Sequence, residues 1–180
     1  MRARILISLA LIASILSISV GMTQQTQYNM PLKTTYESLS PSAKKQVECL
    51  AKNIYYEAGY EPQEGQIAVA FVTINRVKSG NYPGDICGVV KQKTGNTCQF
   101  SWFCQVNDDA GGLTKHNNVV YNSVKELATF VYANYERMTD PSKGALFYHA
   151  DYVNPGWPNM KKTAVIGRHI FYIRKGNTNI

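Results

Sequence analysis

The sequence predicts an α+β fold, a small helical body that carries a C-terminal antiparallel β-hairpin. Three segments, residues 41–58, 62–78 and 123–138, repeat their apolar residues with the period of an amphipathic helix. Later segments are instead rich in the aromatic and β-branched residues that favour strands, and these are residues 144–150, 164–166 and 169–173. Helices that precede strands along a chain, rather than alternating with them, are typical of the α+β class. The 180 residues are enough for about one domain.

The N-terminus has the pattern of a secretory signal. A short basic start is followed by an apolar run over residues 5–20 and by small residues before an expected cleavage point. The run is short for a stable membrane span, which takes about 20 residues. We therefore expect residues 1–21 to be a signal peptide or a releasable signal anchor, with a buried core helix as the alternative. Residues 22–39 are polar and aperiodic and predict a flexible tether, so that the functional domain is 40–180.

The net charge of +7 indicates an anionic partner, which is nucleic acid, a membrane surface or an acidic polymer. Two of these positive charges belong to the predicted signal segment. The remaining Lys and Arg residues are scattered, and no helix or strand gathers them as a nucleic-acid reader would. We expect a monomer, exported to the periplasm or cell wall, that binds no nucleic acid and contacts a membrane only through its N-terminal segment.

Four cysteines indicate disulfide bonds, because an even set in an exported chain is usually oxidised. They are Cys49, Cys87, Cys98 and Cys104. Four cysteines allow three pairings, and the sequence does not choose among them. Their spacing matches no zinc pattern, so we expect neither a metal nor a cofactor. The sequence thus predicts a disulfide-stapled fold.

Local signals mark where the helices begin and end. Ser40 is suited to cap the first helix, Pro41 to occupy its first turn, and Gly59 to end it. Ser123, with a glutamate three residues later, has the pattern of a capping box that opens the third helix. Residues 81–118 are crowded with turn signals and hold three of the four cysteines, which predicts a long irregular segment.

Glu57 is the strongest candidate for a catalytic residue. On a helical projection it lies about 20° from Leu50 and about 60° from Ile54, at the edge of the apolar stripe. Partial burial raises the pKa of a carboxyl group, and a proton retained near neutral pH is what a general acid needs. The alternative is a surface glutamate paired with Lys52 or Lys78.

Two further groups of residues suit carbohydrate chemistry. Residues 98–104 alternate aromatic rings, which stack on sugars, with amide and hydroxyl groups, which bind hydroxyl and N-acetyl groups. A half-buried strand held by a disulfide is the alternative for this segment. A second aromatic and polar group comes from the C-terminal third and consists of Tyr148, His149, Tyr152, Trp157, His169 and Tyr172. Glu61 is a candidate second carboxylate of a two-acid glycosidase, whereas Glu64 suits the start of a helix.

These segments, in this order, resemble the cell wall hydrolase family named after the spore-cortex-lytic enzyme SleB. The matching motifs, within 44–173, include Glu48-Cys-Leu-Ala51, Ile54-Tyr-Tyr-Glu-Ala58, Glu61-Pro-Gln-Glu-Gly-Gln66, Val69-Ala70, Asn75-Arg-Val77, Tyr82-Pro83, Ile86-Cys-Gly-Val-Val90, Cys98-Gln-Phe-Ser-Trp102, Gly144-Ala-Leu-Phe-Tyr148 and Ile166-Gly-Arg-His-Ile-Phe-Tyr172. The resemblance implies a lysozyme-like helical core and a catalytic domain that cleaves peptidoglycan, similar to lytic transglycosylases. The family's catalytic glutamate falls on Glu57. The residues we expect to contact substrate are Tyr56, Glu61, Gln99, Ser101, Trp102, Tyr148 and His149.

The chain departs from the family pattern at two places. Gly59-Tyr60 stands where the family usually has Arg-Gly, and Gln105 stands where an Asp is common. We expect activity or specificity to differ accordingly.

Several activities stay open from sequence alone. The leading hypothesis is a lytic transglycosylase in which one glutamate is acid and then base. The alternatives are a hydrolytic muramidase or glucosaminidase with a second carboxylate, a Cys/His amidase using Cys98 or Cys104 with His149, and a non-enzymatic wall-binding module.

Overall fold

The computed structural model describes residues 34–106 and 115–176. The predicted signal segment 1–21 and residues 22–33 of the predicted tether lie outside the described residues. The described part of the tether, residues 34–39, contains one short 3-10 helix. The elements are η1 (Tyr36–Ser38), α1 (Pro41–Ala58), α2 (Gln63–Lys78), α3 (Ile86–Val90), β1 (Lys93–Thr94), β2 (Thr97–Cys98), α4 (Ser101–Gln105), α5 (Lys115–Asn134), η3 (Tyr135–Arg137), β3 (Phe147–Ala150), β4 (Met160–Ile166) and β5 (His169–Arg174).

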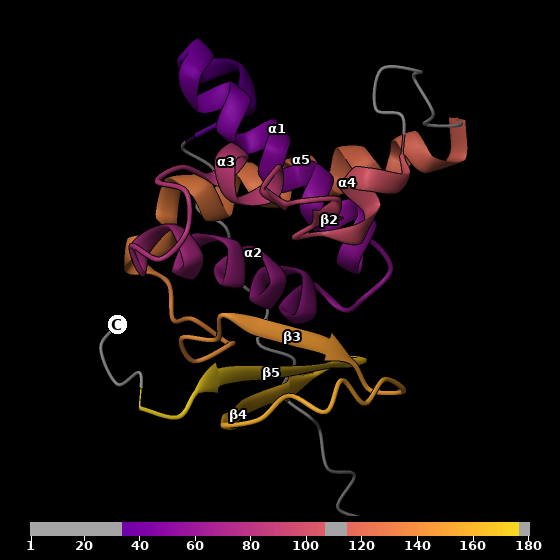
Figure 1. Cartoon of the computed structure of the whole chain (residues 1–180). Helices are drawn as coiled ribbons and strands as arrows, with labels where there is room; N and C mark the ends of the chain where they lie inside the picture. The colour runs from indigo at the N-terminus through magenta and orange to yellow at the C-terminus, as the bar shows by residue number, and fades with distance from the viewer. Residues whose placement is uncertain (1–33, 107–114, 177–180) are drawn as a thin grey trace, which may run out of the picture. The chain divides into compact units, whose positions relative to one another are not determined.

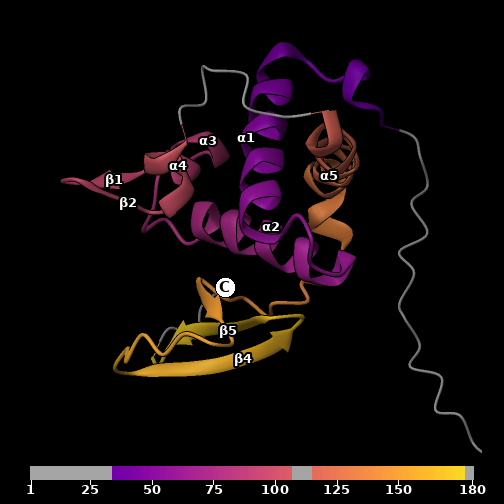
Figure 2. The same cartoon turned by 90° about the vertical axis from the view of Figure 1, so that its right-hand side faces the viewer.

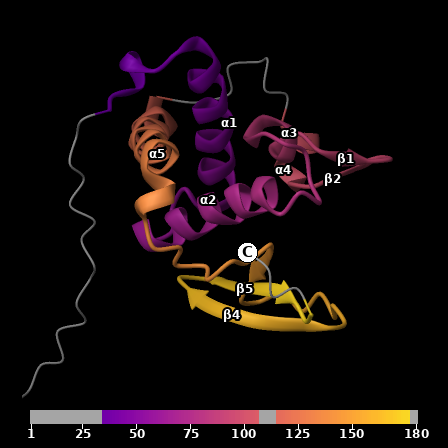
Figure 3. The same ribbon diagram turned by 90° about the vertical axis from the view of Figure 1, so that its left-hand side faces the viewer.

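Helix α2 lies between the other helices and a small sheet, as Figure 1 shows. Figures 2 and 3 show α5 on one side of α1, and α3, α4 and the β1–β2 hairpin on the other. The residues of α2 from Ile67 to Arg76 are all buried, so this helix has no solvent-facing stripe in its centre. Among the described helices, none combines the length and apolar composition that a membrane span requires.

The sheet has three antiparallel strands in the order β3-β5-β4. The predicted hairpin is therefore completed by a third strand, and the predicted α+β class is confirmed. Tyr148 of β3 pairs with Phe171 of β5, and both lie on the face that packs against α2. Phe171 is fully buried there with Val69 and Val72 of α2. Burial of these apolar side chains holds the helical layer on the sheet.

The sequence predicted α1 and α2 almost to the residue. Ser40 caps α1 by accepting a hydrogen bond from the backbone N–H of Ala43 at 3.2 Å, and Pro41 occupies the first turn. Gly59 follows the end of α1 in a right-handed conformation, with φ −58°. A Cβ at Gly59 would lie 2.5 Å from the backbone oxygen of Tyr55, so close approach, not positive φ, requires glycine there.

The third helix and the segment before it differ from the prediction. Helix α5 begins at Lys115, so Ser123 lies inside the helix and the predicted capping box is wrong. Tyr121, which precedes the predicted start of the helix, is buried, and its ring centroid lies 5.7 Å from that of Tyr55. This packing favours a helix that begins before Ser123. The segment expected to be irregular, residues 81–118, contains α3, the β1–β2 hairpin and α4.

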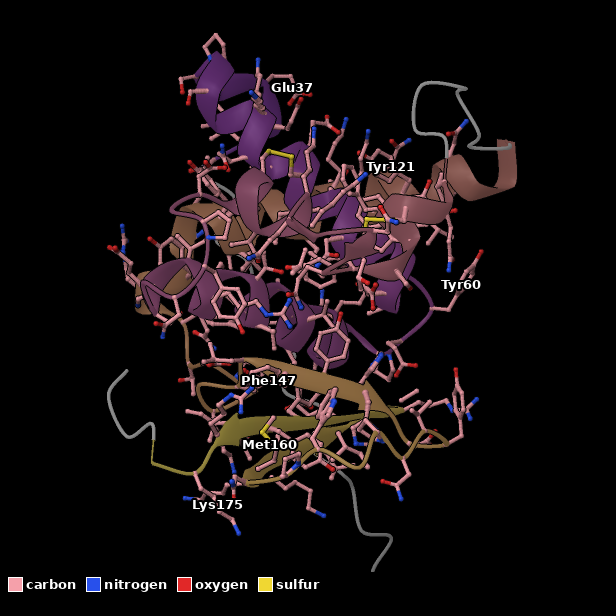
Figure 4. The ribbon with its side chains drawn as sticks, in the orientation of Figure 1. Glu37, Tyr60, Tyr121, Phe147, Met160 and Lys175 are labelled. Atoms are coloured by element: carbon pink, nitrogen blue, oxygen red, sulfur yellow. A yellow bond between two sulfur atoms is a disulfide. The ribbon has the colours of Figure 1, made fainter. Side chains whose placement is uncertain are left out.

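Both pairs of cysteines form disulfides, which confirms the predicted cross-links and fixes their pairing. Cys49 of α1 bonds Cys87 of α3, and Cys98 of β2 bonds Cys104 of α4. The sulfur–sulfur bonds are visible as yellow sticks in Figure 4. The first ties a short helix to the body, and the second closes the loop that bears the predicted sugar-binding motif.

We predict that the two disulfides differ in their contribution to stability. The cysteines of the first are 38 residues apart and those of the second 6, so the first restricts the unfolded chain more. Replacing Cys49 and Cys87 together by alanine should lower the free energy of unfolding by about 4 kcal/mol, against about 2 kcal/mol for Cys98 and Cys104. Urea unfolding monitored by circular dichroism measures both values. An equal or reversed order would contradict the prediction.

Candidate functional site

Glu57 lies in the last turn of α1, where the helical layer meets the sheet. The hydroxyl of Tyr148, on β3, donates a hydrogen bond of 2.9 Å to Oε2 of Glu57. The side chain of Glu57 is half-buried, as the helical projection indicated. The sequence therefore predicted the setting of this carboxyl correctly, and the fold supplies a hydroxyl partner from 91 residues further along the chain.

Burial raises the pKa of Glu57 above its ordinary value of 4.5. The hydrogen bond from Tyr148 and the positive charge of Arg76 favour the ionised form and lower the pKa, but they offset only part of the burial effect. The site therefore holds a carboxyl that keeps its proton to higher pH than an exposed glutamate does. Burial beside Glu57 also raises the pKa of Tyr148, so its hydroxyl is retained as a donor.

Arg76, near the end of α2, is a site residue to which sequence analysis gave no role. Its side chain is only 4 % exposed, and its Nε donates a hydrogen bond of 2.9 Å to the backbone oxygen of Leu146. Its guanidinium lies over the rings of Tyr82 and Phe100, 5.4 and 5.0 Å from their centroids. Burial lowers the pKa of Arg76, but a guanidinium stays protonated in proteins. The sequence did offer a signal for this role, because Arg76 follows a run of mostly apolar residues, where an arginine is unusual.

A cavity of about 260 Å³ adjoins Glu57 and gathers residues from both predicted groups. It is lined by Glu57, Arg76, Cys98, Gln99, Phe100, Ser101, Phe147, Tyr148 and Trp157. The structure thus brings Gln99, Ser101 and Tyr148 together at one cavity, and their contact with substrate stays a prediction. Gln99 and Ser101 are exposed, which leaves an amide and a hydroxyl at the cavity for polar ligands.

A second cavity, of about 300 Å³, also includes Glu57. It is lined by the consecutive residues 55–61, which are the end of α1 and the loop to α2. Tyr60, in this loop, is 76 % exposed, and Figure 4 shows its ring pointing away from the body. Because Glu57 lines both cavities, a chain-like ligand occupying the two would pass its carboxyl group.

Tyr56 and Trp102 stack on each other, with ring centroids 4.6 Å apart and planes inclined by 21°. Trp102 is only 6 % exposed, and its Nε1 donates a hydrogen bond of 3.0 Å to Oδ1 of buried Asn53. Trp102 lines neither cavity at Glu57, whereas Tyr56 lines the second. The structure gives Trp102 a packing role that supports Tyr56 beside Glu57; a substrate contact for either ring stays a prediction.

Glu61 fastens the loop between α1 and α2 to the turn between β4 and β5. Its Oε2 accepts a hydrogen bond of 2.9 Å from the backbone N–H of Arg168. Gly167 has φ +55°, and a Cβ there would overlap the Glu61 carboxylate. The side-chain amide of Gln66 binds the backbone oxygens of Gly59 and Glu61, both at 3.2 Å. This loop is therefore fixed at several points next to Glu57.

His149 lies outside the lining of both cavities. It stacks on Tyr172 with ring centroids 5.2 Å apart, and its Nε2 is 3.1 Å from the Tyr172 hydroxyl. Trp157 packs edge-on against His149 and also lines the first cavity. His149 thus supports the cavity wall through Trp157, and direct substrate contact by His149 stays a prediction.

All four cysteines are disulfide-bonded, which leaves no thiol for the Cys/His amidase alternative. That alternative is wrong for the chain in this oxidised form. Within residues 34–106 and 115–176, no cluster of three or more His, Cys, Asp or Glu side chains could hold a metal ion.

The chain is similar to proteins of known class. A family model described as Cell Wall Hydrolase matches residues 60–172. Spore cortex-lytic enzymes of Halalkalibacterium halodurans and Bacillus subtilis are each 31 % identical over 130 residues. These matches cover 69 % of this chain but only 34 % and 36 % of the relatives, so the chain spans about a third of their length.

Two solved structures are also similar. The catalytic domain of the Bacillus cereus SleB protein is 28 % identical, with a TM-score of 0.50 over 71 % of this chain and 89 % of that one. The catalytic domain of the germination-specific lytic transglycosylase SleB from Bacillus anthracis is 26 % identical, with a TM-score of 0.54 over 74 % and 96 %.

The raised pKa of Glu57 predicts a pH-dependent effect of Glu57→Gln on stability. The folded state holds this proton more tightly than the unfolded state, so the stability from Glu57 is full below pH 4.5 and is lost as pH rises through the folded pKa. Glutamine is neutral throughout and can still accept from Tyr148. The variant should therefore gain stability relative to the parent as pH rises from 4 to 8.

Thermal unfolding of both proteins across this pH range measures the effect. Glu64→Gln, at an exposed position in the first turn of α2, is the control for removing one negative charge. A stability of Glu57→Gln relative to the parent that stays constant or falls as the pH rises would contradict the assignment.

Proposed function

The chain belongs to the cell wall hydrolase family, and we propose that it cleaves the glycan strands of peptidoglycan between N-acetylmuramic acid and N-acetylglucosamine. The observation that carries the proposal is the half-buried Glu57, which has a raised pKa, accepts a hydrogen bond from Tyr148 and lines two cavities. The names of the similar proteins, a cortex-lytic enzyme and a lytic transglycosylase, support the same substrate class.

In the proposed reaction, protonated Glu57 donates its proton to the glycosidic oxygen as the bond from C1 of the muramoyl residue to that oxygen breaks. The bonding electron pair leaves with the oxygen. The Glu57 carboxylate then removes the proton of the C6 hydroxyl of the same residue, and O6 bonds to C1 to close a 1,6-anhydro ring. One carboxyl is thus acid and then base, and its raised pKa keeps the acid form available toward neutral pH.

The setting of Glu61 favours this single-carboxyl reaction over hydrolysis by two carboxylates. A second catalytic carboxylate has to activate water or attack the sugar directly. Oε2 of Glu61 instead accepts the backbone N–H of Arg168 and holds the loop that leads away from Glu57. We therefore propose a lytic transglycosylase, with hydrolysis through Glu61 as the outcome that product analysis would reveal.

The two cavities provide surfaces of the kind that sugars bind. Trp157 is 41 % exposed at the first cavity, and Tyr60 is exposed at the second, so each offers an aromatic face for stacking. Gln99 and Ser101 add an amide and a hydroxyl beside Trp157. We propose that a glycan strand lies across both cavities with its scissile bond at Glu57.

The proposed site of action is outside the cytoplasm, in the periplasm or cell wall. The secretory pattern of residues 1–21 and the positive net charge support it, because the wall is anionic. Two disulfides in the folded domain are also typical of an oxidising compartment.

Digestion of purified peptidoglycan, followed by mass spectrometry of the released muropeptides, tests the proposed reaction. Products should carry 1,6-anhydromuramic ends, and Glu57→Gln should lower the cleavage rate by about 10²–10⁴-fold because the proton donor is lost. Products heavier by one water molecule would show hydrolysis instead. A protein that binds cell walls but does not clear their turbidity would be a wall-binding module.

Glu61→Gln separates the one-carboxyl from the two-carboxyl reaction. Glutamine keeps a side-chain oxygen that can accept from the Arg168 backbone, so the loop contact is retained while the charge is lost. The cleavage rate should stay within about threefold of the parent if Glu61 has no chemical role, whereas a catalytic base would cost about 10²–10⁴-fold. Glu61→Ala, which removes the acceptor, reports the structural share of any loss through its melting temperature.

A further inference from the structure

The first cavity contains a buried cation with an unused hydrogen-bond donor. Arg76 lines this cavity, and within the part of the chain that the structure describes, its Nη1 is buried without a hydrogen-bond partner. Buried polar groups are nearly always paired, and a charged donor left unpaired costs more than a neutral one. An arginine that lines a cavity and has one buried nitrogen without a hydrogen-bond partner is therefore a candidate to bind a ligand atom.

The remainder of the guanidinium is held in place. Nε is bound to the backbone oxygen of Leu146, and the rings of Tyr82 and Phe100 lie against the guanidinium carbon. The side chain is thus a fixed donor rather than a flexible surface arginine. A donor held in position before binding loses little entropy when a ligand arrives.

The charges of the residues that line the cavity indicate what kind of ligand atom would bind Arg76. Glu57 is the single carboxylate among the residues that line the cavity, and it is neutral when it holds the proton that it donates. Arg76 then lacks a counter-charge in the cavity lining. Because the Arg76 side chain is buried, it attracts an anionic acceptor more strongly than a neutral carbonyl.

We propose that Arg76 binds the lactyl carboxylate of a muramoyl residue whose stem peptide has been removed. The inference rests on the proposed function, since it places that residue in the first cavity with its C1 at Glu57. The lactyl group is attached at C3 of the same sugar ring, so its carboxylate lies in the cavity that holds C1. It is ionised only when no peptide is amide-linked to it, and peptide-free strands are therefore the preferred substrate.

Two consequences follow for the reaction. A substrate carboxylate next to Glu57 favours the protonated form of Glu57 and so supports proton donation. The substrate must also be supplied by an amide hydrolysis that cuts the bond between the lactyl group and the first amino acid. This chain would then act after such an amidase on the same wall.

Binding to a Glu57→Gln protein, which retains ligand without cleaving it, tests the inference. The two probes are a GlcNAc–MurNAc tetrasaccharide with free lactyl carboxylates and the same compound with each carboxylate converted to the methylamide. Calorimetry should give at least about tenfold tighter binding of the carboxylate form, the usual gain from a charge-assisted hydrogen bond. Adding Arg76→Met should abolish this preference, and Arg76→Lys should retain part of it.

Arg168→Met in the same background is the matched control, since it removes an exposed guanidinium that pairs with Asp151 on the surface. It should leave the preference unchanged. If Arg76→Met does not fold, as judged by its melting curve, the comparison of the two probes on the Glu57→Gln protein with and without Arg76→Lys still decides. Equal affinities for the two probes would overturn the Arg76 assignment alone, and no binding of either would overturn it together with the proposed function.

Discussion

The hydrogen bond from Tyr148 to Glu57 joins the two layers of the fold at the site where we place the chemistry. Its acceptor ends a helix of the upper layer, and its donor lies on the edge strand of the sheet. The contact forms only when the sheet packs on α2, through the buried cluster around Phe171. The burial that stabilises this packing is also the burial that raises the pKa of Glu57. Stability and the protonation state of the proposed acid thus depend on one interface.

The loop after Glu57 shows how one departure from the family pattern fits this chain. Gly59 lies so close to the backbone oxygen of Tyr55 that a side chain would force the last turn of α1 to move. The hydrogen bonds from Gln66 then hold the loop, and Glu61 ties it to the sheet. An arginine at position 59 would need a different end to α1. The exposed ring of Tyr60 instead adds an aromatic surface to the second cavity, beside Glu57 and Glu61.

Much of this site could be predicted from the sequence, and what could not has a common physical cause. The apolar stripe of α1 located Glu57 at the edge of the core, because an amphipathic helix is governed by local periodicity. The apolar stripe of α2 located the helix in the sequence. The centre of α2 is buried on every side, however, so the stripe did not indicate that Arg76 is buried too. The packing of Trp102 could not be predicted for the same reason, since its ring and its Asn53 partner lie 49 residues apart in the sequence. Contacts between layers, including the disulfide pairing, are set by tertiary packing and leave no local signal.

Arg76 offsets part of the cost of the carboxylate that forms when Glu57 gives up its proton. Before a ligand binds, with Glu57 neutral, the buried guanidinium has no opposite charge in the cavity lining, a state that a low-dielectric interior opposes. Proton donation to the glycosidic oxygen leaves a carboxylate that Arg76 attracts and that Tyr148 hydrogen-bonds. Burial opposes this new carboxylate, and Arg76 and Tyr148 offset part of that cost, so the two groups lower the free energy of the charge that develops during bond breaking. The burial that raises the pKa of Glu57 also keeps the new carboxylate basic enough to take the C6 hydroxyl proton, so one environment serves both halves of the proposed reaction.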